Sequence, residues 1–135
     1  MARGAARRHT GVMQTIYLVD NAPAVRERLF EMLQGVPETT VRMVSACARD
    51  AIDDILADRP DVVLLDLRLD QGSGFDVLRA VHEAAPEVDV YVLTSFASEP
   101  YRRLARRFGA RDFFDKSTEF ERMRAAVCAR AASRH

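Results

Sequence analysis

The sequence predicts an α/β domain built on an open, doubly wound sheet of five parallel strands, with a helix after each strand. Short apolar runs rich in branched and aromatic residues alternate with stretches in which apolar residues recur at helical spacing. The run Asp61–Asp66 is apolar on both faces, as expected for a central strand covered by helices on both sides. At 135 residues and 48% apolar content, the chain suffices for one such core and leaves little room for a second.

We expect the domain to occupy residues 14–131. Residues 1–13 are small, basic and aperiodic, which is typical of a flexible leader, and residues 132–135 are expected to form a C-terminal tail. Right-handed crossovers between the parallel strands would place helices on both faces of the sheet.

The first half of the chain alternates strand and helix twice before the central strand. The branched and aromatic run Thr15–Asp20 predicts the first strand, and Val41–Ser45 the second. Gly35 and Pro37 end the first helix and Pro60 ends the second, because neither residue type continues a helix readily. The apolar stripes of the two helices are Val25, Leu29, Met32 and Leu33, and then Ala48, Ala51, Ile52, Ile55 and Leu56.

The second half begins with a polar, glycine-containing loop. We interpret Gly72–Gly74 as a tight turn with Ser73 near a helix start, because the remaining glycines of a phosphate-cradling loop are absent. Strands are expected at Val88–Thr94 and Arg111–Phe114. The helical stripes are Phe75, Leu78 and Val81; Tyr101, Leu104, Ala105 and Phe108; and Phe120, Met123 and Val127.

Composition excludes several classes of function. Twenty acidic and twenty basic residues cancel, so the chain lacks the positive field that non-specific nucleic-acid binding needs, and we expect no direct contact with nucleic acid. No apolar run reaches the roughly 18 residues of a membrane span, and the N-terminus lacks a secretory signal, so we expect a cytoplasmic protein without membrane contact. Cys47 and Cys128 lack metal-ligand spacing and are expected to be buried thiols.

Polar residues stand where four of the five strands end. In open α/β sheets the ligand site lies beyond the carboxyl ends of the strands. Carboxylates there can hold a hard cation, a hydroxyl can donate to a phosphoryl oxygen, and an ammonium can neutralise it, so the set predicts a phosphoryl-transfer site. The residues are Asp20 with Asn21, Asp66, Thr94 with Ser95, and Asp115 with Lys116.

Each of these residues also has a plainer interpretation. Asp20 could serve simply as the cap of the first helix, and Thr94 could be an ordinary strand residue. Asp66 is different, because a carboxylate that ends an apolar central strand needs cationic partners. Lys116 is the only lysine among twenty basic side chains, so a lysine at this position indicates a requirement for a compact ammonium.

Five short motifs, in order and at the expected strand ends, resemble the receiver domains of response regulators in two-component signalling. They match the acidic pair, the phosphoacceptor strand, the glycine turn, the switch threonine with its small neighbour, and the aromatic-to-lysine end of the last strand. The motifs are Leu18–Asn21, Val62–Asp66, Asp70–Gly74, Val92–Ser95 and Phe113–Lys116.

The resemblance implies a flavodoxin-like fold with strand order 2-1-3-4-5. It implies that Asp66 accepts a phosphoryl group from a sensor histidine kinase or a histidine phosphotransfer protein. Mg²⁺ would be held by Asp20, Asn21, Asp66 and the backbone carbonyl of Arg68. Such a domain is no enzyme in the usual sense, because it catalyses only its own phosphorylation and dephosphorylation.

The resemblance also implies a switch. Thr94 and Lys116 would be drawn to the phosphoryl oxygens, and Phe113 would turn inward behind Thr94. This would alter the face made by the helix near 101–108, the last strand and the last helix, where a partner or a second copy would bind. Four arginines give that helix a basic face that could steer an acidic partner: Arg102, Arg103, Arg106 and Arg107.

Three departures from the family pattern modify these expectations. Asn21 stands where a second carboxylate is common, which predicts weaker Mg²⁺ binding. Ser117 follows the lysine where a cis proline is usual, and a cis bond to a non-proline costs about 3 kcal/mol, so a trans bond and a shifted loop are expected. Arg68 and Phe96 are bulky neighbours of the acceptor and of the threonine, which predicts slow hydrolysis of an acyl phosphate.

Three other functions are compatible with parts of the sequence. A pseudo-receiver would use the same fold as an interaction module without phosphorylation, with Asn21 as a sign of a decayed metal site. A nucleotide-binding domain is disfavoured, because residues 21–24 carry no glycine-rich loop after the first strand. A haloacid-dehalogenase-like phosphatase is disfavoured, because Asp66–Arg68 lacks the second aspartate of an Asp-x-Asp motif.

Overall fold

A computed structural model of the chain describes residues 13–133. Most of the expected leader and the last two residues of the expected tail lie outside this range. Five parallel strands form one sheet in the order β2-β1-β3-β4-β5, which confirms the predicted strand order and the doubly wound topology. The strands are β1 (Gln14–Val19), β2 (Thr39–Met43), β3 (Val62–Leu65), β4 (Asp89–Thr94) and β5 (Asp112–Asp115).

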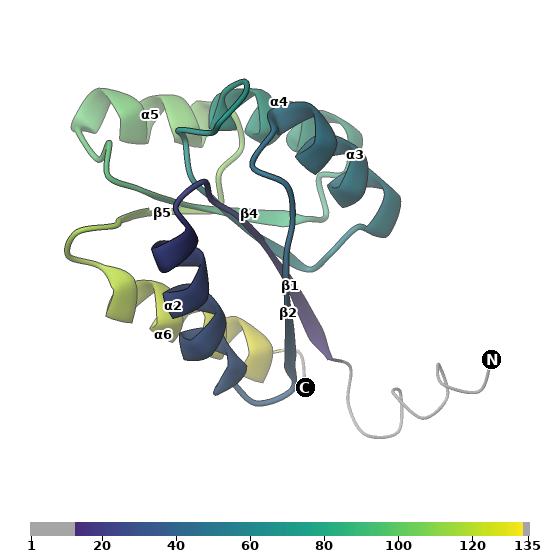
Figure 1. Cartoon of the computed structure of the whole chain (residues 1–135), viewed down its shortest axis with the longest axis vertical. Helices are drawn as coiled ribbons and strands as arrows, with labels where there is room; N and C mark the ends of the chain where they lie inside the picture. The colour runs from purple at the N-terminus through teal and green to yellow at the C-terminus, as the bar shows by residue number, and fades with distance from the viewer. Residues whose placement is uncertain (1–12, 134–135) are drawn as a thin grey trace.

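Helices cover both faces of the sheet. In Figure 1, α3, α4 and α5 lie above the sheet, and α2 and α6 lie below it. The helices are α2 (Pro23–Gln34), α3 (Ala48–Asp58), α4 (Gly74–Ala84), α5 (Glu99–Arg107) and α6 (Phe120–Ala132). None of the helices within residues 13–133 combines the length and apolarity needed to cross a bilayer.

Strand residues alternate between two buried clusters. Val63 and Leu65 pack with the helices α3, α4 and α5, whereas Val62 and Leu64 pack with α2 and α6. All four residues of β3 are buried, as predicted for a central strand. The two cysteines are free thiols as expected, but each is only half-buried.

Two local predictions were wrong. The second strand begins at Thr39, two residues before the expected start, because Thr39 pairs with Gln14 of β1 and both side chains are buried. In α5 only Ala105 is buried, whereas Tyr101 and Leu104 of the expected apolar stripe are exposed. This helix therefore presents apolar as well as basic side chains at the surface.

The loop after β3 is a tight turn followed by a capped helix, as predicted. Ser73 caps α4: its hydroxyl accepts a hydrogen bond from the Phe75 N–H at 3.1 Å, and the Asp76 carboxylate accepts one from the Ser73 N–H at 3.3 Å. Gly74 packs directly on the chain that leaves β3, and its N–H donates to the Leu67 carbonyl. A Cβ at position 74 would lie 2.6 Å from the Leu67 Cα, so only glycine fits beside Asp66.

Gly74→Ala is expected to destabilise the domain by about 2 kcal/mol, because the Asp66 and Leu67 backbone atoms that the new methyl group would meet cannot move aside. Gly35→Ala is the matched control, since its Cβ would meet nothing nearer than 3.6 Å and its φ is −77°. Urea unfolding of both variants measures the difference. Equal midpoints for the two variants would contradict the close approach at Gly74.

Candidate functional site

The carboxyl ends of four strands bring together most of the polar residues expected from the sequence. Asp20 directly follows β1, Asp66 directly follows β3, Thr94 ends β4, and Lys116 directly follows β5. Asp20, Asp66 and Thr94 are at most 5% exposed. Buried carboxylates require partners, because an ionised group loses most of its hydration when it is buried.

Lys116 supplies the partner for both carboxylates. Its Nζ donates to Asp20 Oδ2 at 2.7 Å and to Asp66 Oδ2 at 2.9 Å. The exposed fraction is 12% for the Lys116 side chain and 4% and 6% for those of Asp20 and Asp66. The sole lysine therefore lies between the two carboxylates that the sequence assigned to the site.

Backbone hydrogen bonds hold Asp66 and Lys116 to the neighbouring strands. The Asp66 N–H donates to the Val19 carbonyl at 2.9 Å, and the Lys116 N–H donates to the Thr94 carbonyl at 2.8 Å. These bonds continue the parallel ladders one residue beyond the strands. The sheet thus sets the backbone positions of Asp66 and Lys116.

Each carboxylate uses its second oxygen to hold its own loop. Asp20 Oδ1 accepts from the Ala22 N–H at 2.8 Å, and Asp66 Oδ1 accepts from the Arg68 N–H at 3.3 Å. The N-cap of α2 is Ala22, which makes no side-chain cap bond, so Asp20 is not the capping residue of this helix. Its buried carboxylate faces Lys116 instead.

The pKa of Lys116 is raised above its ordinary value. Burial alone would lower this pKa, but the hydrogen bonds and charges of Asp20 and Asp66 outweigh burial. Lys116 is therefore an ammonium throughout the neutral range. Two carboxylates and one ammonium leave the cluster with one net negative charge.

Thr94 and Phe113 are buried residues of the neighbouring strands β4 and β5. Thr94 is fully buried, and its Oγ1 accepts from the Phe96 N–H at 3.2 Å. Phe113 pairs with Val92 in the sheet and is only 5% exposed. The guanidinium of Arg102 lies 4.8 Å from the centroid of the Phe113 ring. The ring that was expected to turn inward on phosphorylation is already inside in this structure.

The donor atoms of the site suit a hard divalent cation, although only two carboxylates contribute negative charge. Within residues 13–133, no group of three or more His, Cys, Asp or Glu side chains could hold a metal ion. Asp20 and Asp66 nevertheless present carboxylate oxygens, which suit Mg²⁺, an ion that usually keeps several waters. Asn21 is half-buried next to Asp20 and makes no hydrogen bond to the Asp20–Asp66–Lys116 cluster in the described chain. The side chain of Arg68 is exposed.

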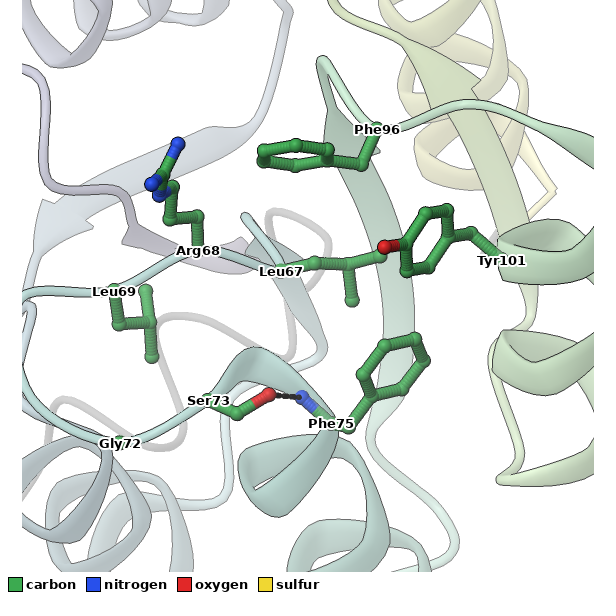
Figure 2. A pocket seen from close by; sticks show the side chains of 8 residues that line it. All are labelled: Leu67, Arg68, Leu69, Gly72, Ser73, Phe75, Phe96 and Tyr101. Carbon is green, nitrogen blue, oxygen red and sulfur yellow. Dashed lines mark hydrogen bonds between the residues drawn. The ribbon is translucent and has the colours of Figure 1, made fainter.

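An aromatic pocket next to the loop that follows Asp66 was not predicted. Its volume is about 520 Å³, and Arg68, Phe75, Phe96 and Tyr101 are among the residues that line it. Figure 2 shows the three aromatic rings along one side, with Arg68 next to Phe96. The Arg68 guanidinium lies 5.4 Å from the Phe96 ring centroid. The bulk of Arg68 and Phe96 was visible in the sequence, but the exposure of Tyr101 was not, because helical spacing assigned it to an apolar stripe.

Comparison with known proteins decides the family. The family model of the response regulator receiver domain matches residues 16–128. The chain belongs to this family. As a receiver domain of the two-component type, it has the family's fold as well: the response regulator domain of Thermotoga maritima CheB superposes with a TM-score of 0.76 at 20% identity, covering 90% of this chain and 95% of that one.

Curated relatives are longer than this receiver domain. Regulatory protein LuxO of Vibrio cholerae is 44% identical over 79 residues, which make up 58% of this chain and 17% of that protein. The DNA-binding transcriptional activator DevR/DosR of Mycobacterium tuberculosis is 33% identical over 87 residues, or 64% of this chain and 40% of that protein. The chain thus spans less than half the length of both relatives.

Asp66→Asn is expected to lower the pKa of Lys116, because the variant removes one of the two charges that hold the ammonium. Since Lys116 is the only lysine, a ¹³Cε-lysine label gives one side-chain signal whose pH titration reports this pKa directly. The raised pKa adds stability that is present below the ordinary lysine pKa and is lost as the pH rises through the folded-state value. Asp70→Asn, an exposed change in the same loop, should leave the titration unchanged. Identical curves for wild type and Asp66→Asn would contradict the ion-pair assignment.

Proposed function

We propose that Asp66 accepts a phosphoryl group in a Mg²⁺-dependent reaction from a sensor histidine kinase or a histidine phosphotransfer protein. The observation that carries this proposal is the bridging of Asp20 and Asp66 by Lys116 at the carboxyl edge of the sheet. The chain's membership of the receiver family supports it. The domain then acts on itself and is no enzyme in the usual sense, and such partners favour a cytoplasmic location.

In the proposed step, a carboxylate oxygen of Asp66 attacks phosphorus in line while the phosphorus–nitrogen bond of the donor phosphohistidine breaks. The donor imidazole leaves with the bonding electron pair, and an acyl phosphate forms on Asp66. Lys116 already lies within hydrogen-bond distance of Asp66 Oδ2, so it can pair with a phosphoryl oxygen after a small movement. The Thr94 hydroxyl is the proposed second donor.

Asp20, Asn21, Asp66 and the backbone carbonyl of Arg68 are the proposed ligands of Mg²⁺. When bound, Mg²⁺ neutralises charge on the transferred phosphoryl group. Asp20 and Asp66 contribute two charges, whereas Asn21 contributes only an amide oxygen. We therefore expect phosphorylation to proceed but to need more Mg²⁺ than it would with a second carboxylate at position 21.

The proposed output surface consists of α5, β5 and α6. Tyr101 and Leu104 expose apolar side chains on α5, and Arg103, Arg106 and Arg107 are exposed on the same helix. A protein partner or a second copy of the domain would bind there without direct contact to nucleic acid. Thr94 and Phe113 connect the acceptor site to this surface through adjacent strands.

A second candidate function is a pseudo-receiver that binds its partner without phosphorylation. Two observations favour it. Asn21 removes one charge from the metal site, and Phe113 already lies inside beneath Arg102 in the unmodified chain. A mimic of the phosphoryl group would leave such a module unchanged.

Incubation with Mg²⁺ and a small phosphodonor such as phosphoramidate is expected to add one phosphoryl group to the wild-type chain and none to Asp66→Asn. Intact mass spectrometry detects the gain. Asp70→Asn is the matched control, because Asp70 is an exposed carboxylate in the same loop, and this variant should still be modified. A mass gain that persists in Asp66→Asn would refute the acceptor assignment, and the absence of any gain in wild type would favour the pseudo-receiver.

Asn21→Asp is expected to lower the Mg²⁺ concentration needed for half-maximal modification of Asp66 by about tenfold, equivalent to about 1.4 kcal/mol. The added carboxylate would stand next to Asp20 at the same strand end. The rate of mass gain, followed across a Mg²⁺ titration, measures the change. Identical Mg²⁺ dependence in wild type and Asn21→Asp would show that position 21 is not a metal ligand.

A further inference from the structure

The segment between β5 and α6 carries Lys116 without the proline that usually follows this lysine in receiver domains. Ser117 occupies that position, and no peptide bond within residues 13–133 is cis, as the sequence predicted for this bond. Lys116 has a long, flexible side chain that loses conformational entropy when it is held in one place. Other contacts must therefore direct it toward Asp20 and Asp66.

Asp115 and Ser117 form the first of these contacts. Asp115 Oδ1 accepts hydrogen bonds from the Ser117 N–H at 2.9 Å and from the Ser117 hydroxyl at 2.6 Å. The side chain of Asp115 thus closes a turn around Lys116. Asp115 itself pairs with Thr94 in the β4–β5 register, so the turn is anchored to the sheet.

Glu119 closes the same turn from the other side. Its Oε1 accepts from the Asp115 N–H at 2.7 Å, while the Glu119 N–H donates to the Asp115 carbonyl at 2.8 Å. The Glu119 side chain is only 17% exposed and also contacts Arg122 at 2.6 Å and Arg102 at 3.5 Å. The backbone on both sides of Lys116 is therefore fixed by two carboxylates.

Both carboxylates are ionised at neutral pH. Hydrogen bonds from the Ser117 hydroxyl and N–H lower the pKa of Asp115, and the hydrogen bond from the Asp115 N–H lowers the pKa of Glu119. The two groups consequently act as acceptors under the conditions in which Lys116 is an ammonium.

We propose that Asp115, Ser117 and Glu119 are positioning residues that hold Lys116 against Asp20 and Asp66, in place of a cis proline. None of the three touches either carboxylate of the cluster, so their effect is exerted through Lys116. The inference deepens the proposed function, on which it rests for the role of Lys116 in phosphoryl transfer. The placement of the ammonium itself does not require phosphorylation.

The test compares Glu119→Ala with the conservative Glu119→Gln, whose amide oxygen can still accept from the Asp115 N–H. The single ¹³Cε-lysine signal reports the placement of Lys116 in each variant. Glu119→Ala is expected to move the chemical shift of this signal toward that of a free lysine. It should also lower the maximal rate of Asp66 phosphorylation about tenfold without changing the half-saturating Mg²⁺ concentration, and Glu119→Gln should restore both.

Ser117→Ala provides a second variant, because it removes only an exposed hydroxyl and its hydrogen bond to Asp115. It is expected to shift the lysine signal in the same direction by a smaller amount. Arg122→Ala is the control, since Arg122 contacts Glu119 from the solvent side. An unchanged lysine signal in both folded Glu119→Ala and Ser117→Ala would overturn the inference. If wild type is never phosphorylated, the proposed function fails, and the lysine signal still decides the positioning role.

Discussion

Two buried carboxylates, Asp20 and Asp66, share the single ammonium of Lys116, and the arrangement of the carboxyl edge of the sheet depends on this charge balance. Burying an ion is costly unless a partner compensates it, and removing one member of such a set leaves an uncompensated charge. The three residues lie 46 and 50 positions apart along the chain. Only the parallel topology, in which β1, β3 and β5 all end at the same edge, brings them together. The same topology leaves one net negative charge there, which suits a divalent cation.

Each of the three residues is held by a different local device. The Asp20 side chain accepts a hydrogen bond from the backbone N–H two residues later. The backbone at Asp66 and Leu67 packs so closely against position 74 that only glycine fits there. Lys116 lies in a turn closed by Asp115 and Glu119. Glu119 also contacts Arg102 of α5, and Arg102 lies over the Phe113 ring. Glu119 and Arg102 therefore link the turn around Lys116 to α5 by direct side-chain contacts.

The sequence was sufficient to predict those features of the fold and of the site that depend on local patterns. Alternating strand and helix patterns predicted all five units and the buried central strand, and the strand-end rule selected Asp20, Asp66 and Lys116 before any contact was known. The predicted start of the second strand was wrong, because the burial of Thr39 depends on its pairing with Gln14 in another strand. The cover of Phe113 by Arg102 and the closure of the Lys116 turn could not be predicted, because both depend on side-chain conformations in segments that meet only after folding. The missing proline after Lys116 was visible, but the contacts that replace it were not.

If Asp66 and its neighbours form a Mg²⁺-dependent acceptor for a phosphoryl group, the domain should bind beryllofluoride at Asp66, and ¹⁹F NMR detects such binding. Beryllofluoride imitates a phosphoryl group on a carboxylate, so bound fluorine signals report the site without any donor protein. Wild type with Mg²⁺ is expected to give signals distinct from those of free beryllofluoride, and no such signals are expected without Mg²⁺ or in Asp66→Asn. Wild type without bound signals at saturating Mg²⁺, or bound signals that persist in Asp66→Asn, would contradict the assignment of Asp66 as the acceptor.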